Sequence, residues 1–444
     1  MSTSGMARSL VSPIAATLAI VLLWAQVGGA EEPVDVGKEL MIVDLAVIED
    51  PIRTDPEEGE SAVWTFKHLM EQMAGDTDPS DFVMNWLLTW TVDQDINGSN
   101  APARPQIRDK VITPWLAASG GEKLDLSLAP FKLLAIVNRI DLRAQQNENV
   151  VSAGEGRFVF GVLDADGMPL AAGGFTVIFE YELLAHTDTE LKKWADRWHR
   201  LGRFELGSPR YNRQLAELTR RFTDRNRKRY RDRINQSALK QLRTNEVALG
   251  LPWELREFQL DPQSGQLVQH PVARTPDFAA LNGTPMLADL VNQNEAALLE
   301  NSFVVPPALL AASTPAGPFT QQLIQDLGPR TFSTHEIRPG ALVFNIPWSA
   351  AGIRNNEARH MFALQTCGGC HRDETGTGFL HVGFPRAHDL PVSLGTPAQL
   401  SAFLTGTDQP DPVDGTTIRH FNDLERRQLD FTELLNSFRR GTGG

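Results

Sequence analysis

The sequence predicts an α+β protein, in which a large mixed N-terminal region precedes a small, mostly α-helical C-terminal region. Three observations predict this class. Apolar runs with strand-like spacing and hairpin signals fill the middle of the chain, amphipathic helical segments stand before and after them, and only helical segments follow residue 350. With 444 residues the chain exceeds one ordinary core, so we expect more than one domain.

Residues 1–30 are typical of a secretory signal peptide. Arg8 gives a weakly positive start, Ile14 to Trp24 is apolar, and the small residues Gly28 and Ala30 precede the expected cleavage point. The apolar run is too short to predict a membrane span, although an uncleaved anchor is the alternative. The sequence therefore predicts export to the periplasm or the cell exterior.

The composition is that of a globular protein, with 41% hydrophobic and 22% charged residues. The formal net charge is −13. Because so acidic a chain repels a phosphate backbone, we expect no nucleic-acid partner.

The large region, residues 31–350, is expected to begin with a buried strand over Leu40–Glu49, which is rich in Ile, Val and Leu. Two amphipathic helices follow, one over Ser61–Ala74 and one capped by Ser80. The nearly continuous apolar segment Phe131–Ile140 then predicts a buried strand.

A β-hairpin and a helix are expected next. Arg157–Leu163 and Phe175–Leu184 flank an Asp166-Gly167 turn, which is a hairpin signal. A helix is expected from Asp188 to Gly202. Further strands are expected at Leu242–Leu249, Trp253–Leu260 and Gln266–His270.

The segment Tyr211–Ile234 predicts a long, strongly basic helix. Between Arg213 and Arg233, nine Lys or Arg residues stand against three acidic ones. A solvated face that pairs with the acidic remainder of the chain explains this pattern. The functional alternative is that residues 213–233 dock an acidic redox partner or contact an anionic membrane surface.

Proline-rich loops at residues 306–318 and 329–339 mark the end of the large region, and Ala341–Pro347 predicts its last strand. We place the boundary near Ala350, so that residues 351–444 form the second domain. Its expected helices are Asn355–Thr366, Pro397–Leu404 and Phe421–Phe438.

The chemistry of the chain is indicated by Cys367-Gly368-Gly369-Cys370-His371. The chain has only two cysteines, and they stand at this spacing with a histidine directly after the second. By composition alone the coincidence has a chance of about one in ten thousand. Two thiols on one helical turn are able to add to the two vinyl groups of one haem edge, and the next imidazole is then directed at the iron. Two glycines remove side-chain bulk where the backbone approaches the porphyrin.

At these residues the C-terminal region resembles a single-haem c-type cytochrome domain. The resemblance implies one covalent haem c, attached at Cys367 and Cys370, with His371 as proximal ligand. The whole chain, notably residues 133–143 and 360–405, also resembles an uncharacterised group of exported bacterial proteins with a large region before such a motif. Bacterial attachment of haem c takes place outside the cytoplasm, in agreement with the signal peptide.

The distal iron ligand departs from the family pattern. Cytochrome domains of this kind usually supply a methionine after the motif, but no methionine follows Met361. Three histidines remain downstream, at 381, 388 and 420. We favour His381, which lies in the apolar context Phe379-Leu380-His381-Val382; an open distal position is the alternative.

Two other interpretations of the Cys367–His371 motif do not involve haem. A disulfide between Cys367 and Cys370 would close a loop too short to stabilise much. Zinc held by the cysteines with His371, His381 or His388 would lack the second ligand pair that structural zinc sites usually have.

The sequence therefore predicts an exported electron carrier rather than a catalyst, with one haem and an unidentified redox partner. The first alternative is a haem enzyme of the peroxidase or oxidase type with an open distal site. The second is an extracellular binding protein whose Cys/His cluster is a structural metal site. The oligomeric state is not predicted.

Overall fold

A computed structural model describes residues 33–146, 149–170, 174–250, 253–312, 314–315, 347–385 and 395–440. The predicted signal peptide, the loop at residues 329–339, most of the predicted strand Ala341–Pro347 and His388 lie outside these ranges. Residues 34–444 form one compact unit. In the described part of the chain, no helix is long and apolar enough to cross a membrane.

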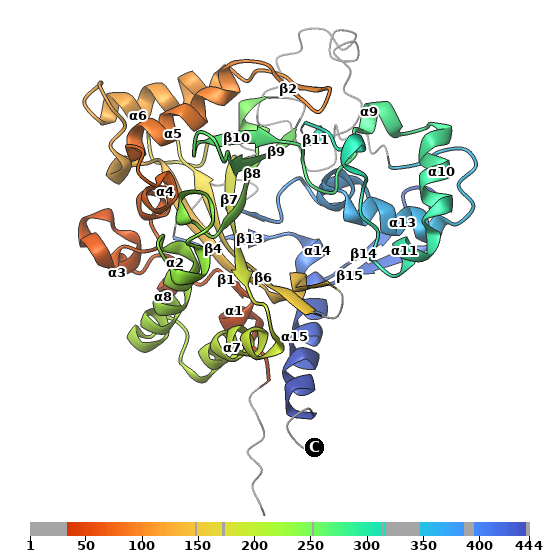
Figure 1. Ribbon diagram of the computed structural model, residues 1–444. Coiled ribbons are helices and arrows are strands. Elements are labelled where there is room, and N and C mark those ends of the chain that lie inside the picture. The colour runs from red at the N-terminus through yellow and green to blue at the C-terminus, as the bar shows by residue number, and fades with distance from the viewer. Residues whose placement is uncertain are drawn as a thin grey trace, which may run out of the picture. The chain divides into compact units, whose positions relative to one another are not determined.

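The centre of the unit is an antiparallel sheet (Figure 1). Its described strands follow the spatial order β1-β4-β6-β7-β8-β9-β10, with β5 beside β6 and β11 beside β9. These strands are β1 Met41–Ile42, β4 Phe131–Arg139, β5 Ala144–Gln146, β6 Asn149–Val162, β7 Thr176–Leu184, β8 Leu239–Asn245, β9 Glu254–Leu260, β10 Leu267–His270 and β11 Thr314–Pro315. The mixture of this sheet with separate helices confirms the α+β class.

Most predicted strands are confirmed, and the Asp166-Gly167 turn joins β6 to β7 as expected, with Gly167 at a positive φ of 75°. Two predictions need correction. The segment Leu40–Glu49 contains only the short β1, because the Asp44 carboxylate accepts a hydrogen bond from the Ala46 backbone N–H and starts α2, Leu45–Ile48. Strand β8 ends at Asn245, and a 3-10 turn replaces its predicted end.

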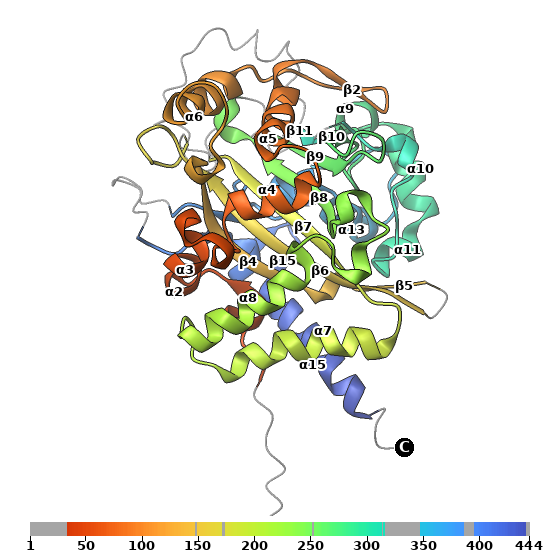
Figure 2. The same cartoon turned by 60° about the vertical axis from the view of Figure 1, so that its left-hand side comes forward.

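Helices cover one face of the sheet (Figure 2). The elements of this N-terminal half are α1 Val36–Glu39, α2, α3 Pro51–Thr54, α4 Phe66–Ala74, α5 Pro79–Leu88, the small hairpin β2 Gln94–Ile96 with β3 Ser99–Ala101, α6 Thr113–Ala118, α7 Asp188–His199 and α8 Pro209–Thr223. Helix α5 is capped by Asp78 rather than by the predicted Ser80.

The predicted long basic helix Tyr211–Ile234 is wrong in its length. Helix α8 ends at Asp224, which leaves the helical conformation with φ −71° and ψ 131°. Asn226 then adopts a left-handed φ of 64°, which stops an α-helix but suits asparagine. After Asn226, the segment predicted as helix contains only two short 3-10 turns, Lys228–Tyr230 and Ile234–Gln236.

The helix-covered face of the sheet is apolar and rich in aromatic rings. Phe158, Phe160, Phe179 and Tyr181 alternate along β6 and β7 and belong to the main core. Phe66 of α4 stacks on Phe131 with ring centroids 3.9 Å apart. Apolar residues between these rings, such as Val159 and Ile178, point to the other side of the sheet and belong to a second core.

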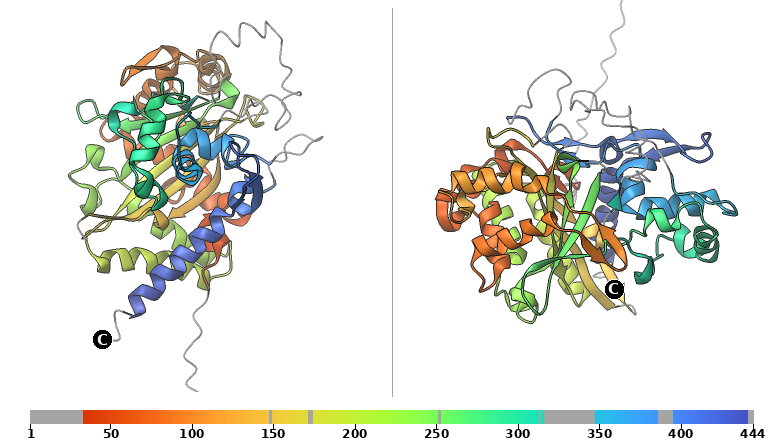
Figure 3. Two further views of the ribbon diagram at one scale, coloured as in Figure 1. Left: turned by 90° about the vertical axis from the view of Figure 1, so that its right-hand side faces the viewer. Right: turned by 90° about the horizontal axis from the view of Figure 1, so that it is seen from above.

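The opposite face of the sheet carries charge, although it is also covered. In register across the strands, Arg157 faces Glu180, and Arg243 faces Glu257. The C-terminal part of the chain lies over this face (Figure 3). Phe384 packs so closely on it that a Cβ on Gly161 would lie 2.3 Å from the Phe384 ring.

The C-terminal part is a mixture of helices and small hairpins rather than the mostly helical domain expected. Two of its predicted elements need correction: in place of one helix, Pro397–Leu404 contains β13 and the start of the short α14, and the last helix begins at Asp423, because Phe421 ends β15. Its elements and those just before it are α9 Phe278–Leu281, α10 Pro285–Gln293, α11 Glu295–Leu299, α13 Asn356–Gln365, β12 Val382–Gly383, β13 Gln399–Leu400, α14 Ala402–Thr405, β14 Thr407–Pro410, β15 Ile418–Phe421 and α15 Asp423–Arg440.

Packing crosses the boundary that the sequence predicts near Ala350. Phe362 of α13 shares a core with Leu298 of α11. Phe431 of α15 is fully buried in the main core, beside His199 of α7. The residues after 350 therefore share their buried surface with the large region.

Candidate functional site

The Cys367–His371 motif lies directly after α13 on a short helical segment, called the motif turn, which becomes π-helical over Gly369–Asp373. Its start is fixed by backbone contacts: Cys367 N–H donates to Thr275 Oγ1 at 3.0 Å, and Cys370 N–H donates to the Thr366 carbonyl at 3.0 Å. Both thiols are free, so the predicted disulfide alternative is not formed. Cys367 packs beside Trp253, whereas burial raises the pKa of the Cys370 thiol to about 12.

The glycine at 369 has a packing role that differs from the one expected from the sequence. A Cβ at this position would lie 2.1 Å from the Ala363 carbonyl oxygen of α13. The glycine therefore lets the motif turn fold back onto its own helix, so the close approach is to protein backbone.

Replacing Gly369 with alanine should displace this turn. The clash is with backbone, which has little freedom to give way, and we expect a loss of about 1–3 kcal/mol in the free energy of unfolding, measured by urea denaturation. Gly378→Ala is the matched control, because nothing lies within 4 Å of a Cβ there. Equal effects of the two substitutions would contradict the packing role.

His371 is held as a neutral imidazole with one nitrogen available. Its Nδ1 lies 2.7 Å from the Phe379 carbonyl oxygen, which only accepts, so Nδ1 carries the proton and Nε2 keeps its lone pair. Burial lowers the pKa of His371 to about 4, and the nearby Arg243 and Arg157 add to this effect. A neutral imidazole oriented by a backbone carbonyl is the form that binds a metal ion.

His381 lies against His371, with ring centroids 4.2 Å apart. Two imidazoles on opposite sides of one iron have centroids about 6 Å apart, because each iron–nitrogen bond is about 2 Å long. The structure therefore does not place His381 as the distal ligand that the sequence favours. Instead its Nδ1 lies 2.9 Å from Ser401 Oγ and its Nε2 lies 3.5 Å from Cys370 Sγ.

The other downstream histidine that the structure describes is not part of this site. His420 has a side chain that is 75% exposed and pairs with Asp408 at 2.6 Å. It therefore stands in solvent, as its polar sequence context indicates.

A small cavity of about 90 Å³ adjoins His371 and His381. The donor atoms beside it fit a c-type haem, since two free thiols and a neutral imidazole are present. The space does not fit, because sites for molecules of cofactor size have volumes of about 300–1,000 Å³. A haem would require His381 and the residues next to it to move away from His371.

A buried ion-pair network, which the sequence analysis did not predict, contacts the motif turn. Arg359 of α13, with a side chain 2% exposed, donates two hydrogen bonds to Glu374, at 2.8 and 2.7 Å, and one to Asp411 at 2.9 Å. His360 contacts the same Glu374 carboxylate. Asp411 also accepts two bonds from Arg419.

His360, Glu374 and Asp411 place their ligand atoms within 4.8 Å of one another, a spacing that could hold a metal ion. Arg359 and Arg419 already neutralise both carboxylates and occupy their oxygens. The network is therefore a structural clamp that joins α13, the motif turn and the β14–β15 hairpin.

Charged side chains on the buried face of the sheet are the second feature that sequence reasoning missed. Arg139, Arg157 and Arg427 line the cavity together with His371 and His381. The available signal was the charged residues that stand between apolar ones in β6 to β9. Such alternation usually indicates a solvent-exposed face, so the sequence did not identify these arginines as site residues.

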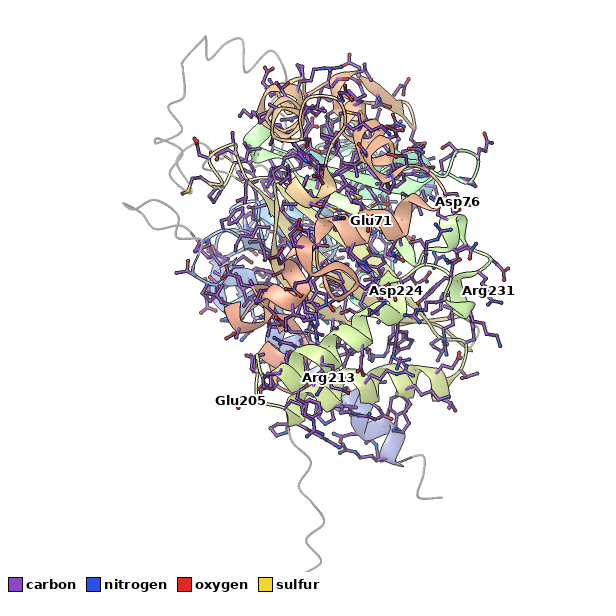
Figure 4. The ribbon with its side chains drawn as sticks, turned by 90° about the vertical axis from the view of Figure 1, so that its left-hand side faces the viewer. Glu71, Asp76, Glu205, Arg213, Asp224 and Arg231 are labelled. Atoms are coloured by element: carbon purple, nitrogen blue, oxygen red, sulfur yellow. The ribbon has the colours of Figure 1, made fainter. Side chains whose placement is uncertain are left out.

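The basic stretch after residue 209 forms a surface of mixed charge. Figure 4 shows acidic residues, Glu205, Asp224 and Asp76, on the same side of the molecule as the basic residues Arg213 and Arg231. Several of its arginines form ion pairs with acidic residues: Arg220 and Arg227 with Asp224, Arg225 with Asp76, Arg229 with Glu190, and Arg233 with Glu182. This pairing favours the solvated-face interpretation over a membrane contact.

Comparisons of this chain with protein families, with curated proteins and with solved structures found no match.

Proposed function

We propose that this protein carries one covalent haem on Cys367 and Cys370, with His371 as the iron ligand, and transfers single electrons to or from a redox partner outside the cytoplasm. The observation that supports this most directly is the bond between His371 Nδ1 and the Phe379 carbonyl. This bond leaves Nε2 of His371 free to bind iron, and His371 directly follows Cys370. A haem bound there would supply a one-electron couple.

The residues around His371 suit this role. Trp253 is fully buried, with its ring centroid 5.7 Å from His371 and 5.4 Å from Phe379, so the two rings keep water from one side of the imidazole. The Arg359–Glu374 clamp holds the residue three positions after His371. An iron ligand that is held in place, uncharged and shielded from water would change its position little when the iron gains or loses an electron.

Covalent haem is tested by producing the full chain in a host that matures c-type cytochromes. We expect a haem stain on a denaturing gel for the native protein and none for the Cys367→Ser/Cys370→Ser variant. The His371→Ala variant should keep the stain, because its thiols remain, but should change the absorption spectrum. A colourless native protein would contradict the proposal.

Two alternatives have observations of their own. His381 lies too close to His371 to bind iron from the opposite side, which favours a haem enzyme with an open distal site; such an enzyme predicts a high-spin spectrum that changes on adding peroxide. The 3.5 Å approach of Cys370 Sγ to His381 Nε2 favours a structural metal site, and metal analysis that finds zinc without iron would select it.

A further inference from the structure

The cavity beside His371 has an unusual lining for a buried space. Its charged lining residues are Arg139, Arg157 and Arg427, and none of the described residues that line it is acidic. Its other polar lining is Asn245 and the two histidines. Guanidinium groups gathered around a small cavity attract an anion.

The carboxylates that pair with these arginines lie outside the lining. Arg139 is held by Asp141 at 2.9 and 3.0 Å, Arg157 by Glu155 and by Glu180 at 3.0 Å, and Arg427 by Asp423 at 2.6 Å. The pairs fix the orientation of the guanidinium groups. No carboxylate stands among the described residues that line the cavity, so an anion inside it would meet three guanidinium groups.

Arg427 of α15 has a donor that the described structure leaves unused. Its side chain is only 7% exposed, and its buried Nε–H has no hydrogen-bond partner among the described residues. Burial lowers the pKa of Arg427 to about 10, and Arg139 adds to this effect, against the opposing influence of Asp423 and Asp141. A buried charged donor without an acceptor is costly, and an anion in the cavity would satisfy it.

We propose that this cavity binds a small oxyanion or carboxylate group, with Arg427 as the direct ligand and Arg139 and Arg157 supplying the positive field. The volume of about 90 Å³ equals about three water molecules and therefore admits an ion the size of nitrite, formate or sulfate. The ligand is a free anion from solution. The site does not use the two thiols but shares His371 with the proposed haem, so it is tested in protein that carries no haem.

The test is calorimetric titration of sodium nitrite into the full-length Cys367→Ser/Cys370→Ser variant, which cannot attach haem. Sodium gluconate, whose anion is too large for the cavity, keeps the ionic strength constant. We expect one binding site, weakened about tenfold or more by Arg427→Gln, since a charge-assisted hydrogen bond is lost. Equal affinity with and without Arg427→Gln, or no binding at millimolar nitrite, would overturn the proposal.

Arg426→Gln is the matched control. Arg426 neighbours Arg427 on α15 and pairs with the same Asp423, but its side chain is 54% exposed and does not line the cavity. We expect its affinity for nitrite to stay close to that of the parent. A loss as large as that of Arg427→Gln would show a general charge effect and overturn the assignment.

A second measurement covers the case in which Arg427→Gln does not fold. Selenate in crystals of the native protein without haem should give an anomalous peak close enough to Arg427 Nε for a selenate oxygen to accept its hydrogen bond; no peak there overturns the proposal.

Discussion

Arg359→Met should lower the free energy of unfolding by about 3–5 kcal/mol, because it removes one partner of a buried ion-pair network. Glu374 and Asp411 are both fully buried, and the guanidinium of Arg359 bonds to each of them. Without it, two carboxylates stay desolvated beside each other. Urea unfolding followed by tryptophan fluorescence measures the loss.

Arg359→Met should also reduce haem attachment, because its partner Glu374 stands three residues after His371. With its clamp removed, the motif turn should loosen, and a smaller fraction of the protein should acquire haem in a competent host. Arg359→Lys should have an intermediate effect, since lysine keeps the charge but not the planar pair of donors.

Arg354→Met is the matched control for this prediction. Arg354 lies just before α13, is exposed, and its side chain has no ion pair among the described residues. We expect a change within about 0.5 kcal/mol for this surface substitution. If Arg359→Met lowered the free energy of unfolding by as little as Arg354→Met, the buried ion-pair network would not be what holds the motif turn.

Asp141→Asn should destabilise the protein strongly at pH 7 and much less in acid. Asp141 is 3% exposed and joins the end of β4 to α15 through Arg139, at 2.9 and 3.0 Å, and Arg426, at 2.8 Å. Loss of its charge leaves the buried Arg139 without its partner, which costs about 3–5 kcal/mol. The closing helix α15 loses one of its connections to the sheet at the same time.

The pH dependence follows from the direction of the pKa shift. Burial alone would raise the pKa of Asp141, but Arg139 outweighs it, with help from Arg427 and Arg426, and holds the pKa far below its ordinary value. A depressed pKa contributes stability that is present above the unfolded value of about 3.9 and is lost as the pH falls further. The native protein and the variant should therefore converge below pH 4.

Unfolding in urea at pH 7, 5 and 3 measures this convergence. Asp196→Asn serves as the control, because the Asp196 side chain is 45% exposed and, among the described residues, forms an ion pair only with Lys192 on the surface of α7. Its effect should be at most about 1 kcal/mol at every pH. A constant gap between the native protein and Asp141→Asn from pH 7 to pH 3 would contradict the assigned ionic role.

What the sequence alone determines is local. The period-2 spacing in residues 157–163 and 175–184, with the Asp166-Gly167 turn between them, determines a hairpin, and the spacing of α7 determines a helix. The adjacency of Cys367, Cys370 and His371 likewise needs no tertiary information. These features depend on residues a few positions apart, and that is the range over which propensity and spacing act.

The tertiary structure alone decides which face of the sheet is covered and by what. Arg139, Arg157 and Arg427 meet in one cavity although Arg427 lies 270 residues after Arg157 along the chain. Alternating charge in β6 to β9 looks like a solvent-exposed face, and only the docking of the C-terminal part turns it into a buried one. The physical reason is that burial of a charged face depends on long-range packing and ion pairing, which local spacing does not encode.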